Sequence, residues 1–396
     1  MINYWPLKYE TPDMRRRTVD GLRCLRKLIG EAMPEPSLHD TLVLGTWNIR
    51  NFDDNRFGHG PRIREAMYFL AETISAFDVL AVQELCRDLG PLRQLMRLLG
   101  PQYDYIVTDV AEQDGGNRER LGFIYNRAKV RFKGVAGEMV LPVRDLIEHG
   151  DAHLQPARSP FGCEFQAGWF RFLFTTVHIY FGKESQGSPE YARRVAEIDA
   201  VAANIAARAE KEPCSYILVG DFNIDKMGDP SGNALIRNGF QAAQNNVGSN
   251  ADRTKFYDQI SWLPRKGTVR QTRSARNQGV LDVLSAVMDE DRFPDYRQAV
   301  EATVRGQLDK ARTERAEALA GHKDTDTLDR RIAKLDALLA DPAGLRDYYL
   351  TTWRTFQVSD HLPLWVELSI DFSAEYLTRL RNMSGTLIRD NVDIPM

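Results

Sequence analysis

Polar side chains that can bind a metal or move a proton follow short apolar runs at several points of this sequence. The run 216–219 has the composition of a buried strand, and Gly220, Asp221 and Asn223 follow it directly. Other apolar runs place similar residues at or beside a predicted strand end: Asn48, Glu84, His178, Asp258, Asp360 and His361. Since strand ends on one edge of a sheet are rigid and open, we expect these side chains to share one site.

This set of side chains suits the hydrolysis of phosphate esters. Carboxylate and amide oxygens are hard ligands, which favour Mg²⁺ or Mn²⁺ over zinc. The histidines are then available for proton transfer or for stabilising an anion. Each motif taken alone has an ordinary structural interpretation, because Asp221 and Asn223 suit a turn and His178 suits a core. Their joint occurrence favours a metal-dependent active site.

The apolar runs alternate with helical patterns, which indicates an α/β domain. Predicted strands cover 42–48, 78–84, 121–125, 170–178, 216–219, 256–262 and 364–368. Helical patterns cover 62–77 and 188–209, the second with Ser188 as cap and Pro189 in its first turn. The order of strands and helices predicts sheets covered by helices.

Three segments lie outside or interrupt this pattern. Residues 1–40 comprise a basic amphipathic helix at about 14–30 and a proline-containing linker, and residues 372–396 comprise a C-terminal helix and tail. Within a main domain at 41–371, residues 294–345 have the apolar spacing of an inserted helical hairpin. That hairpin could dock a protein partner or mediate self-association.

The bulk composition excludes several classes of protein. A formal net charge of −3 over 396 residues excludes a uniformly basic nucleic-acid binder, although a local basic face is compatible with it. The 4 cysteines form no C-x-x-C pair, so we expect reduced thiols and neither a disulfide framework nor a zinc site. We see no signal peptide or membrane-spanning run, and therefore expect a cytoplasmic protein without a membrane partner.

In chain order the motifs resemble those of the endonuclease/exonuclease/phosphatase superfamily, which has the DNase I-like fold. The resemblance rests on Trp47-Asn48, Gln83-Glu84, Thr176-Val177-His178, Gly220-Asp221-Phe222-Asn223 and Ser359-Asp360-His361. It covers roughly residues 41–371 apart from the hairpin. It implies an α/β (α+β) four-layer sandwich, in which two packed β-sheets are flanked by helices.

The resemblance also implies roles for individual residues. Glu84 matches the main metal ligand of the family, with Asn48 beside it and Asp360 as a further contributor, and the cofactor would be Mg²⁺ or Mn²⁺. Asp221 matches the residue that orients or deprotonates the attacking water. Asn223 matches the amide that steadies the phosphate or the metal-bound water.

The two histidines have matching roles in the family as well. His361 corresponds to the histidine that contacts the scissile phosphate, and Asp258 to the carboxylate that sets its tautomer. His178 corresponds to the histidine that stabilises the transition state or protonates the leaving oxygen. Some members carry an acidic residue where this chain has Arg50, so a second metal site is not implied there. Arg50 could contact phosphate or pair with Asp53 or Asp54.

The substrate is predicted from charge. A basic run, Arg265, Lys266, Arg270 and Arg273, follows the strand that carries Asp258 and could track a nucleic-acid backbone, or form a solvated loop. We therefore expect a magnesium-dependent nuclease, with DNA preferred over RNA. The alternatives are a phosphatase or phosphodiesterase for a small or lipid phosphate, and a module that docks a partner through the hairpin.

Overall fold

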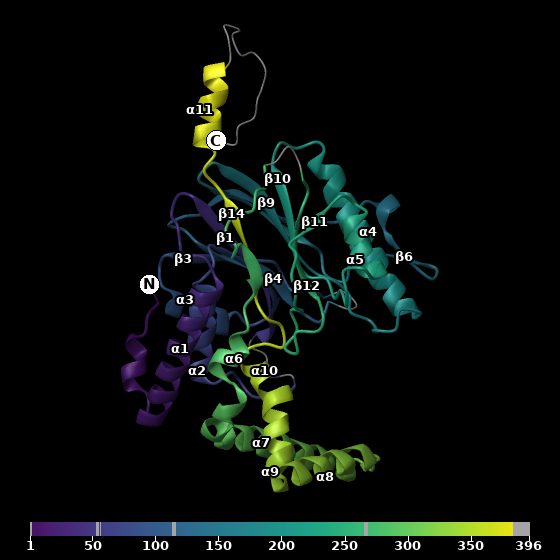
Figure 1. Cartoon of the computed structure of the whole chain (residues 1–396). Helices are drawn as coiled ribbons and strands as arrows, with labels where there is room; N and C mark the ends of the chain where they lie inside the picture. Colours follow the sequence, from purple (N-terminus) through teal and green to yellow (C-terminus); the bar gives the residue numbers. More distant parts are fainter. Residues whose placement is uncertain (1, 53–54, 56, 113–115, 265–267, 383–396) are drawn as a thin grey trace.

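The computed structural model describes every residue except 1, 53–54, 56, 113–115, 265–267 and 383–396. Two sheets of six strands each pack face to face, and helices cover the outer face of each sheet (Figure 1). Both sheets combine parallel and antiparallel strands. The predicted α/β sandwich of two packed sheets flanked by helices is confirmed.

The first sheet contains the strands that carry Asn48 and Glu84. Its order is β13-β14-β1-β2-β4-β3. The strands are β13 (Gln278–Val280), β14 (Leu364–Ser369), β1 (Thr41–Phe52), β2 (Val79–Leu85), β4 (Arg120–Asn126) and β3 (Tyr103–Val107). β1 runs parallel to β2 and antiparallel to β14. β1 continues four residues beyond Asn48, so this asparagine lies within the strand rather than at its end.

The second sheet contains the strands that carry His178, Asp221 and Asp258. Its order is β11-β12-β10-β9-β8-β5. The strands are β11 (Gln241–Ala242), β12 (Asp258–Trp262), β10 (Ser215–Asp221), β9 (Phe170–His178), β8 (Phe161–Ala167) and β5 (Arg131–Glu138). A separate hairpin pairs β6 (Ile147–His149) with β7 (Ala152–Leu154). β9 and β10 are parallel, and β12 is antiparallel to β10.

An apolar layer between the sheets holds them together. Alternate residues of the central strands point into it, including Leu44, Phe123, Phe174, Val219 and Val366, all almost fully buried. This alternation is the period of two expected of β-strands. Because this layer fixes the separation of the two sheets, it also fixes how polar groups on their edges face one another.

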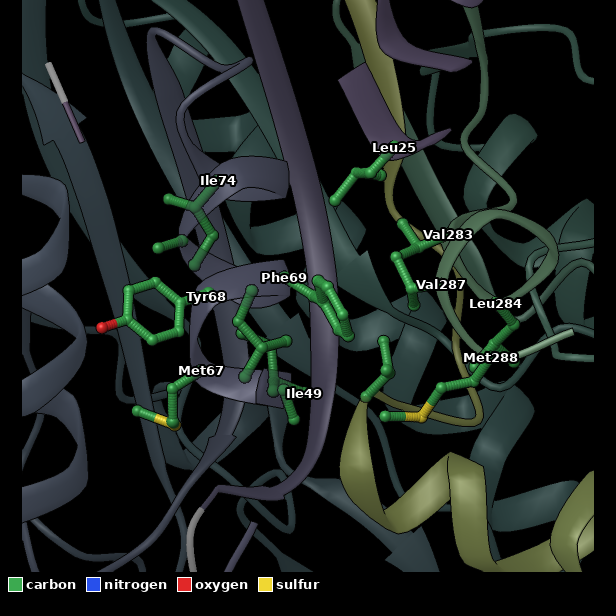
Figure 2. Packing of buried hydrophobic residues seen from close by; sticks show 14 of the residues in the cluster. Leu25, Ile49, Met67, Tyr68, Phe69, Ile74, Val283, Leu284, Val287 and Met288 are labelled. Carbon is green, nitrogen blue, oxygen red and sulfur yellow. The ribbon is translucent and has the colours of Figure 1, made fainter. Parts of the chain in front are cut away.

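Helices cover the outer face of the first sheet. They are α1 (Pro12–Ala32), α2 (Arg64–Ile74), α3 (Gly90–Leu99) and α6 (Val283–Val287). Figure 2 shows Phe69 of α2 packed among Leu25, Ile49 and Val283. The basic face of α1 is partly paired within the chain, because Arg17 and Arg26 contact Glu65 and Glu72 of α2. The outer face of the second sheet is covered by α4 (Pro189–Ala209) and α5 (Pro230–Ile236).

The predicted hairpin region consists of α7 (Phe293–Ala320) and α8 (Asp326–Ala340), which pack on each other. It continues through α9 (Pro342–Tyr348), a π-helical turn (Tyr349–Trp353) and α10 (Arg354–Gln357), which leads back to Asp360. Short 3₁₀ turns lie at Trp5–Tyr9, Val143–Asp145 and Glu290–Arg292. The C-terminal helix α11 (Ser373–Asn382) projects from the opposite end of the sandwich (Figure 1).

Candidate active site

Strand register brings three predicted residues together on the second sheet. Asp221, the last residue of β10, pairs with His178 of parallel β9 on one side and with Asp258 of antiparallel β12 on the other. An antiparallel strand begins where its parallel neighbours end, so the start of β12 meets the ends of β9 and β10. The three residues therefore lie side by side on one edge.

The first sheet presents its polar residues at the facing edge. Asn48 on β1 is beside Gln83 of β2, next to Glu84, and β14 begins just after His361. Asn48 Nδ2 donates to Glu84 Oε1 at 2.9 Å and to Asp221 Oδ2 at 3.0 Å. One amide thus joins the two sheets. The packing brings Asn48, Glu84, His178, Asp221, Asp258 and His361 into one cluster.

His361 is oriented by one carboxylate and faces another. Its Nδ1 lies 2.7 Å from Asp258 Oδ2, and its Nε2 lies 3.7 Å from Asp221 Oδ2. Burial of the ring lowers the pKa of His361, but the carboxylates of Asp258 and Asp221 outweigh it and hold that pKa well above 6.5. The two carboxylates therefore favour the protonated form of His361.

His178 occupies a matching position on the other side of Asp221. Its Nε2 lies 3.5 Å from Asp221 Oδ2, and its Nδ1 lies 3.2 Å from Glu119 Oε2, without hydrogen-bond geometry. Arg158 Nε donates to the same Glu119 oxygen at 2.8 Å. Burial alone would raise the pKa of Glu119, but His178 and Arg158 lower it to about 2. Both imidazoles thus stand between a carboxylate of their own and a shared Asp221.

Glu119 lies at the cluster, although the sequence analysis does not predict it as a site residue. It directly precedes β4, whose Arg120 pairs with Leu85 of antiparallel β2. The start of β4 therefore lies at the same edge as the end of β2. Its signal in the sequence is a carboxylate two residues before the apolar run at 121–125, at the start of a strand rather than at its end.

Backbone conformation at the site departs from the ordinary regions. Glu84 and Asn223 have φ values of 61° and 54°, in the left-handed region. Asn223 is held there, since its N–H donates to Asp221 Oδ1 at 2.9 Å and its Nδ2 donates to the Ile179 carbonyl at 2.7 Å. Gly220, with φ 132°, lies where a Cβ would be 2.1 Å from the Val177 carbonyl oxygen. Such strain is typical of functional sites.

The donors around Glu84 fit a hard divalent cation. The side-chain oxygen of Asn48 is buried and accepts no hydrogen bond from any described residue, although its amide nitrogen donates to two carboxylates. A buried amide oxygen without a partner is costly unless a cation or water completes it. Glu84, Glu119 and His178 place one candidate ligand atom each within 4.8 Å of one another. Glu84 and Asn48 therefore suit the predicted metal site.

Asp360 and Arg50 pair with each other beside the cluster. Arg50 Nε lies 3.3 Å from Asp360 Oδ2, and its guanidinium stacks 3.7 Å above the Phe356 ring. Neither group of metal-capable side chains found among the described residues includes Asp360. Arg50 also donates to Thr355, so the inserted helices determine where this arginine lies.

The basic run lies away from this cluster where it can be followed. Arg265 and Lys266 fall outside the described residues. The Arg270 carbonyl accepts a hydrogen bond from the backbone N–H of Ser369. The neighbouring residue of β14, Leu368, pairs with Leu42 of β1. Asn48 lies six positions along β1 from Leu42, roughly 20 Å at about 3.3 Å per residue. The structure therefore does not bring Arg270 to the cluster, and Arg273 lies on the same stretch beside β14.

Comparison with known proteins identifies the family. A family model described as "Endonuclease/Exonuclease/phosphatase family" matches residues 45–361. The chain belongs to this family. Its members are hydrolases that act on phosphoesters and use divalent metals. No curated protein matches the sequence.

Several solved structures resemble this endonuclease/exonuclease/phosphatase family chain. A family protein from Bacteroides thetaiotaomicron is 17% identical with a TM-score of 0.46, over 85% of this chain and 98% of that chain. A mannosyl-6-phosphatase from the same organism is 22% identical with a TM-score of 0.45, over 61% and 90%. The human Nocturnin catalytic domain is 13% identical with a TM-score of 0.43, over 62% and 86%. None of them says what this chain hydrolyses.

Within the described residues, no helix has the length and hydropathy needed to cross a bilayer.

Proposed function

We propose that this chain is a metal-dependent phosphodiesterase that hydrolyses DNA by attack of water on phosphorus. The observation that carries the proposal is the pair of imidazoles facing one carboxylate oxygen, with His178 Nε2 at 3.5 Å and His361 Nε2 at 3.7 Å from Asp221 Oδ2. Phosphodiester hydrolysis requires a group that activates water, a cation facing the phosphate, and an acid for the leaving oxygen.

The residues divide these tasks by position. Asp221 lies at the centre of the cluster and orients and deprotonates the attacking water. His361, cationic because Asp258 and Asp221 raise its pKa, faces the phosphate oxygens. His178, held between Glu119 and Asp221, gives a proton to the leaving oxygen. Asn223, fixed through its N–H and its Nδ2, steadies the phosphate.

A divalent ion, Mg²⁺ or Mn²⁺, would be held by Glu84 and by the side-chain oxygen of Asn48. When bound, it supplies positive charge that offsets the negative charge developing on the phosphate. Because Asn48 Nδ2 donates hydrogen bonds to Glu84 and Asp221, the orientation of the Asn48 side-chain oxygen is fixed. Asn48 therefore sets the position of the metal carboxylate relative to the water-activating carboxylate.

Exposed arginines beside the metal site support a polyanionic substrate. Arg87 follows Glu84 closely and Arg118 precedes Glu119; both pair with Glu112, and their side chains remain 69% and 76% exposed. Phosphate contacts by such side chains provide most of the affinity for nucleic acid. In sequence each lies within three residues of Glu84 or Glu119, unlike Arg270. We therefore place the DNA backbone along the rim formed by Arg87 and Arg118.

A second candidate is a small phosphodiester. A pocket of about 330 Å³ adjoins the cluster and is lined by Glu84, Glu119, Arg50, Phe356 and neighbouring residues. This volume is in the range of small-molecule sites. The inserted helices form one wall of this pocket through Phe356. A substrate small enough to enter it would be hydrolysed without the arginine rim.

The test compares duplex DNA, single-stranded DNA, RNA and bis(p-nitrophenyl) phosphate as substrates of the full chain with Mg²⁺. We expect DNA cleavage that EDTA abolishes, with about 100- to 10,000-fold losses for Asp221→Ala and His361→Ala. His322→Ala, on the exposed turn between α7 and α8, is the matched histidine control and should retain full activity. Hydrolysis of the small diester alone would favour the second candidate, and inactivity on all substrates would refute the proposal.

Metal binding has an independent readout. Mg²⁺ at 100 times its Kd should stabilise the wild-type chain by about 2.7 kcal/mol. Glu84→Gln should abolish this stabilisation because it removes the charged ligand. An equal stabilisation of the variant and the wild type would place the metal elsewhere.

A further inference from the structure

Arg194 is a fully buried arginine beneath the two loops that carry the catalytic edge of the second sheet. It lies on α4, on the helix face that also buries Tyr191, Glu197 and Ile198. Its Nε donates to the Phe181 carbonyl at 2.9 Å, and its Nη2 donates to the same carbonyl and to that of Lys183 at 2.8 Å. These contacts anchor the segment that follows His178.

The other end of the guanidinium reaches the loop after Asp221. Arg194 Nη1 donates to the Asn223 carbonyl at 2.7 Å and to Asp225 Oδ2 at 3.4 Å. Lys255 holds the second oxygen of Asp225 at 2.7 Å. One side chain from a helix therefore ties together the loops that leave β9 and β10.

The five contacts use every N–H of the guanidinium. An ammonium group has three donors and lacks the planar fork, so lysine cannot reproduce this pattern. The contacts converge on Asn223, whose N–H, carbonyl oxygen and Nδ2 are all bonded within the chain. Among the described residues no donor contacts Asn223 Oδ1. All polar atoms of Asn223 except Oδ1 are thus hydrogen-bonded within the chain, and Oδ1 remains available to a ligand.

We propose that Arg194 is a positioning residue that holds Asn223 in its left-handed conformation and sets its distance from His178. The inference rests on the proposed function, in which Asn223 steadies the phosphate. The Asp221 carboxylate accepts a hydrogen bond from the Asn223 N–H, and Arg194 donates one to the carbonyl oxygen of the same residue. Without the hydrogen bond from Arg194, the peptide group after Asn223 can rotate. The side-chain amide of Asn223 then leaves the position set by its bond to the Ile179 carbonyl.

Glu197 supports the same segment one helical turn further along. Its carboxylate accepts from the backbone N–H of Tyr180 at 3.1 Å and from that of Ala157 at 3.2 Å. Arg194 and Glu197 are three residues apart and share one face of α4. Glu197 thus binds the N–H of Tyr180, and Arg194 binds the carbonyl oxygen of Phe181. These two contacts hold the residues after His178 in place along α4.

The test is a double-mutant cycle on phosphodiester hydrolysis. Arg194→Lys should lower kcat about 100-fold, the effect of a misplacement of about 1 Å, and leave KM and the Mg²⁺ half-saturation unchanged. In an Asn223→Ala background the same substitution should cost less than about threefold, since the residue it positions is gone. Arg193→Lys, the same substitution at the preceding residue of α4, should leave kcat unchanged. Its guanidinium lies over the Tyr180 ring.

Additive losses in the cycle would overturn the proposal, because they would show that Arg194 acts through the fold as a whole. If Arg194→Lys does not fold, Asp225→Asn carries the same test, with a smaller loss of kcat that also vanishes without Asn223. A crystal structure of Arg194→Lys is independent of activity and should show Asn223 released from the Ile179 carbonyl. If Asn223 is unchanged in that crystal structure, the proposal for Arg194 is overturned, whether or not the wild type is active. Inactivity of the wild type by itself refutes only the proposed function.

Discussion

Replacing Glu119 by glutamine tests whether its charge stabilises the folded active site. The pKa of Glu119 falls from an ordinary 4.5 to about 2, because His178 and Arg158 outweigh the effect of burial. A difference of about 2.5 between the folded and unfolded pKa values corresponds to about 3 kcal/mol. Removal of one partner from a buried ion pair independently suggests about 3–5 kcal/mol.

The sign of the effect follows from the lowered pKa. A carboxylate with a depressed folded pKa contributes its full stability above 4.5 and loses it as the pH falls toward 2. The free-energy difference between wild type and Glu119→Gln should therefore be about 3 kcal/mol at pH 7 and about 2 kcal/mol at pH 3.5. Urea unfolding at several pH values measures this difference.

Activity gives the second arm of the experiment. Glu119→Gln should lower the hydrolysis rate at pH 7 by about 100-fold, the lower end of what a positioned acid contributes. Glu164→Gln is a matched control, because Glu164 is also buried against an arginine, Arg171, but lies on β8 away from the cluster. It should leave the rate unchanged. A Glu119→Gln variant as stable as the wild type, with a parallel pH profile, would refute the reasoning.

Three further outcomes follow from the same geometry. Gly220→Ala should cost about 3–5 kcal/mol in urea unfolding, because its Cβ would lie 2.1 Å from the Val177 carbonyl; a loss below 1 kcal/mol would contradict the close approach. Activity should fall as the pH rises through the raised pKa of His361, and Asp258→Asn should move this alkaline limb to lower pH in a pH–rate profile. Arg270→Ala should leave kcat/KM for a short oligonucleotide unchanged, since Arg270 pairs with Glu375 away from the cluster; a tenfold loss would place the substrate differently.

The sequence alone predicted which strands place polar residues at the cluster. Asn48, Glu84, His178 and Asp221 were predictable because each lies on or at the end of an apolar run long enough to be a buried strand. The terminal residue of a buried strand lies at an edge of the sheet irrespective of how the rest of the chain folds. The motif order around these residues also predicted the family, which the family model confirms.

Partners across the two sheets were decided only by the tertiary structure. Glu119 and Arg194 are charged residues in a loop and on a helix, and in sequence they are indistinguishable from surface residues. Their burial depends on antiparallel β4 beginning beside the end of β2, and on α4 packing against the second sheet. Sheet order and helix placement arise from the packing of the whole core, so no local pattern encodes them.

The basic run illustrates the same limit from the other side. Its charge was plain in the sequence, but the path of residues 270–278 along the outer edge of β14 carries Arg270 toward Glu375 and away from Asp221. Likewise, Arg50 pairs with Asp360 because α10 returns the chain to the edge of β1. Sequence fixes the charge of a segment, whereas the direction of the strand beside it decides which end of the sandwich that charge faces.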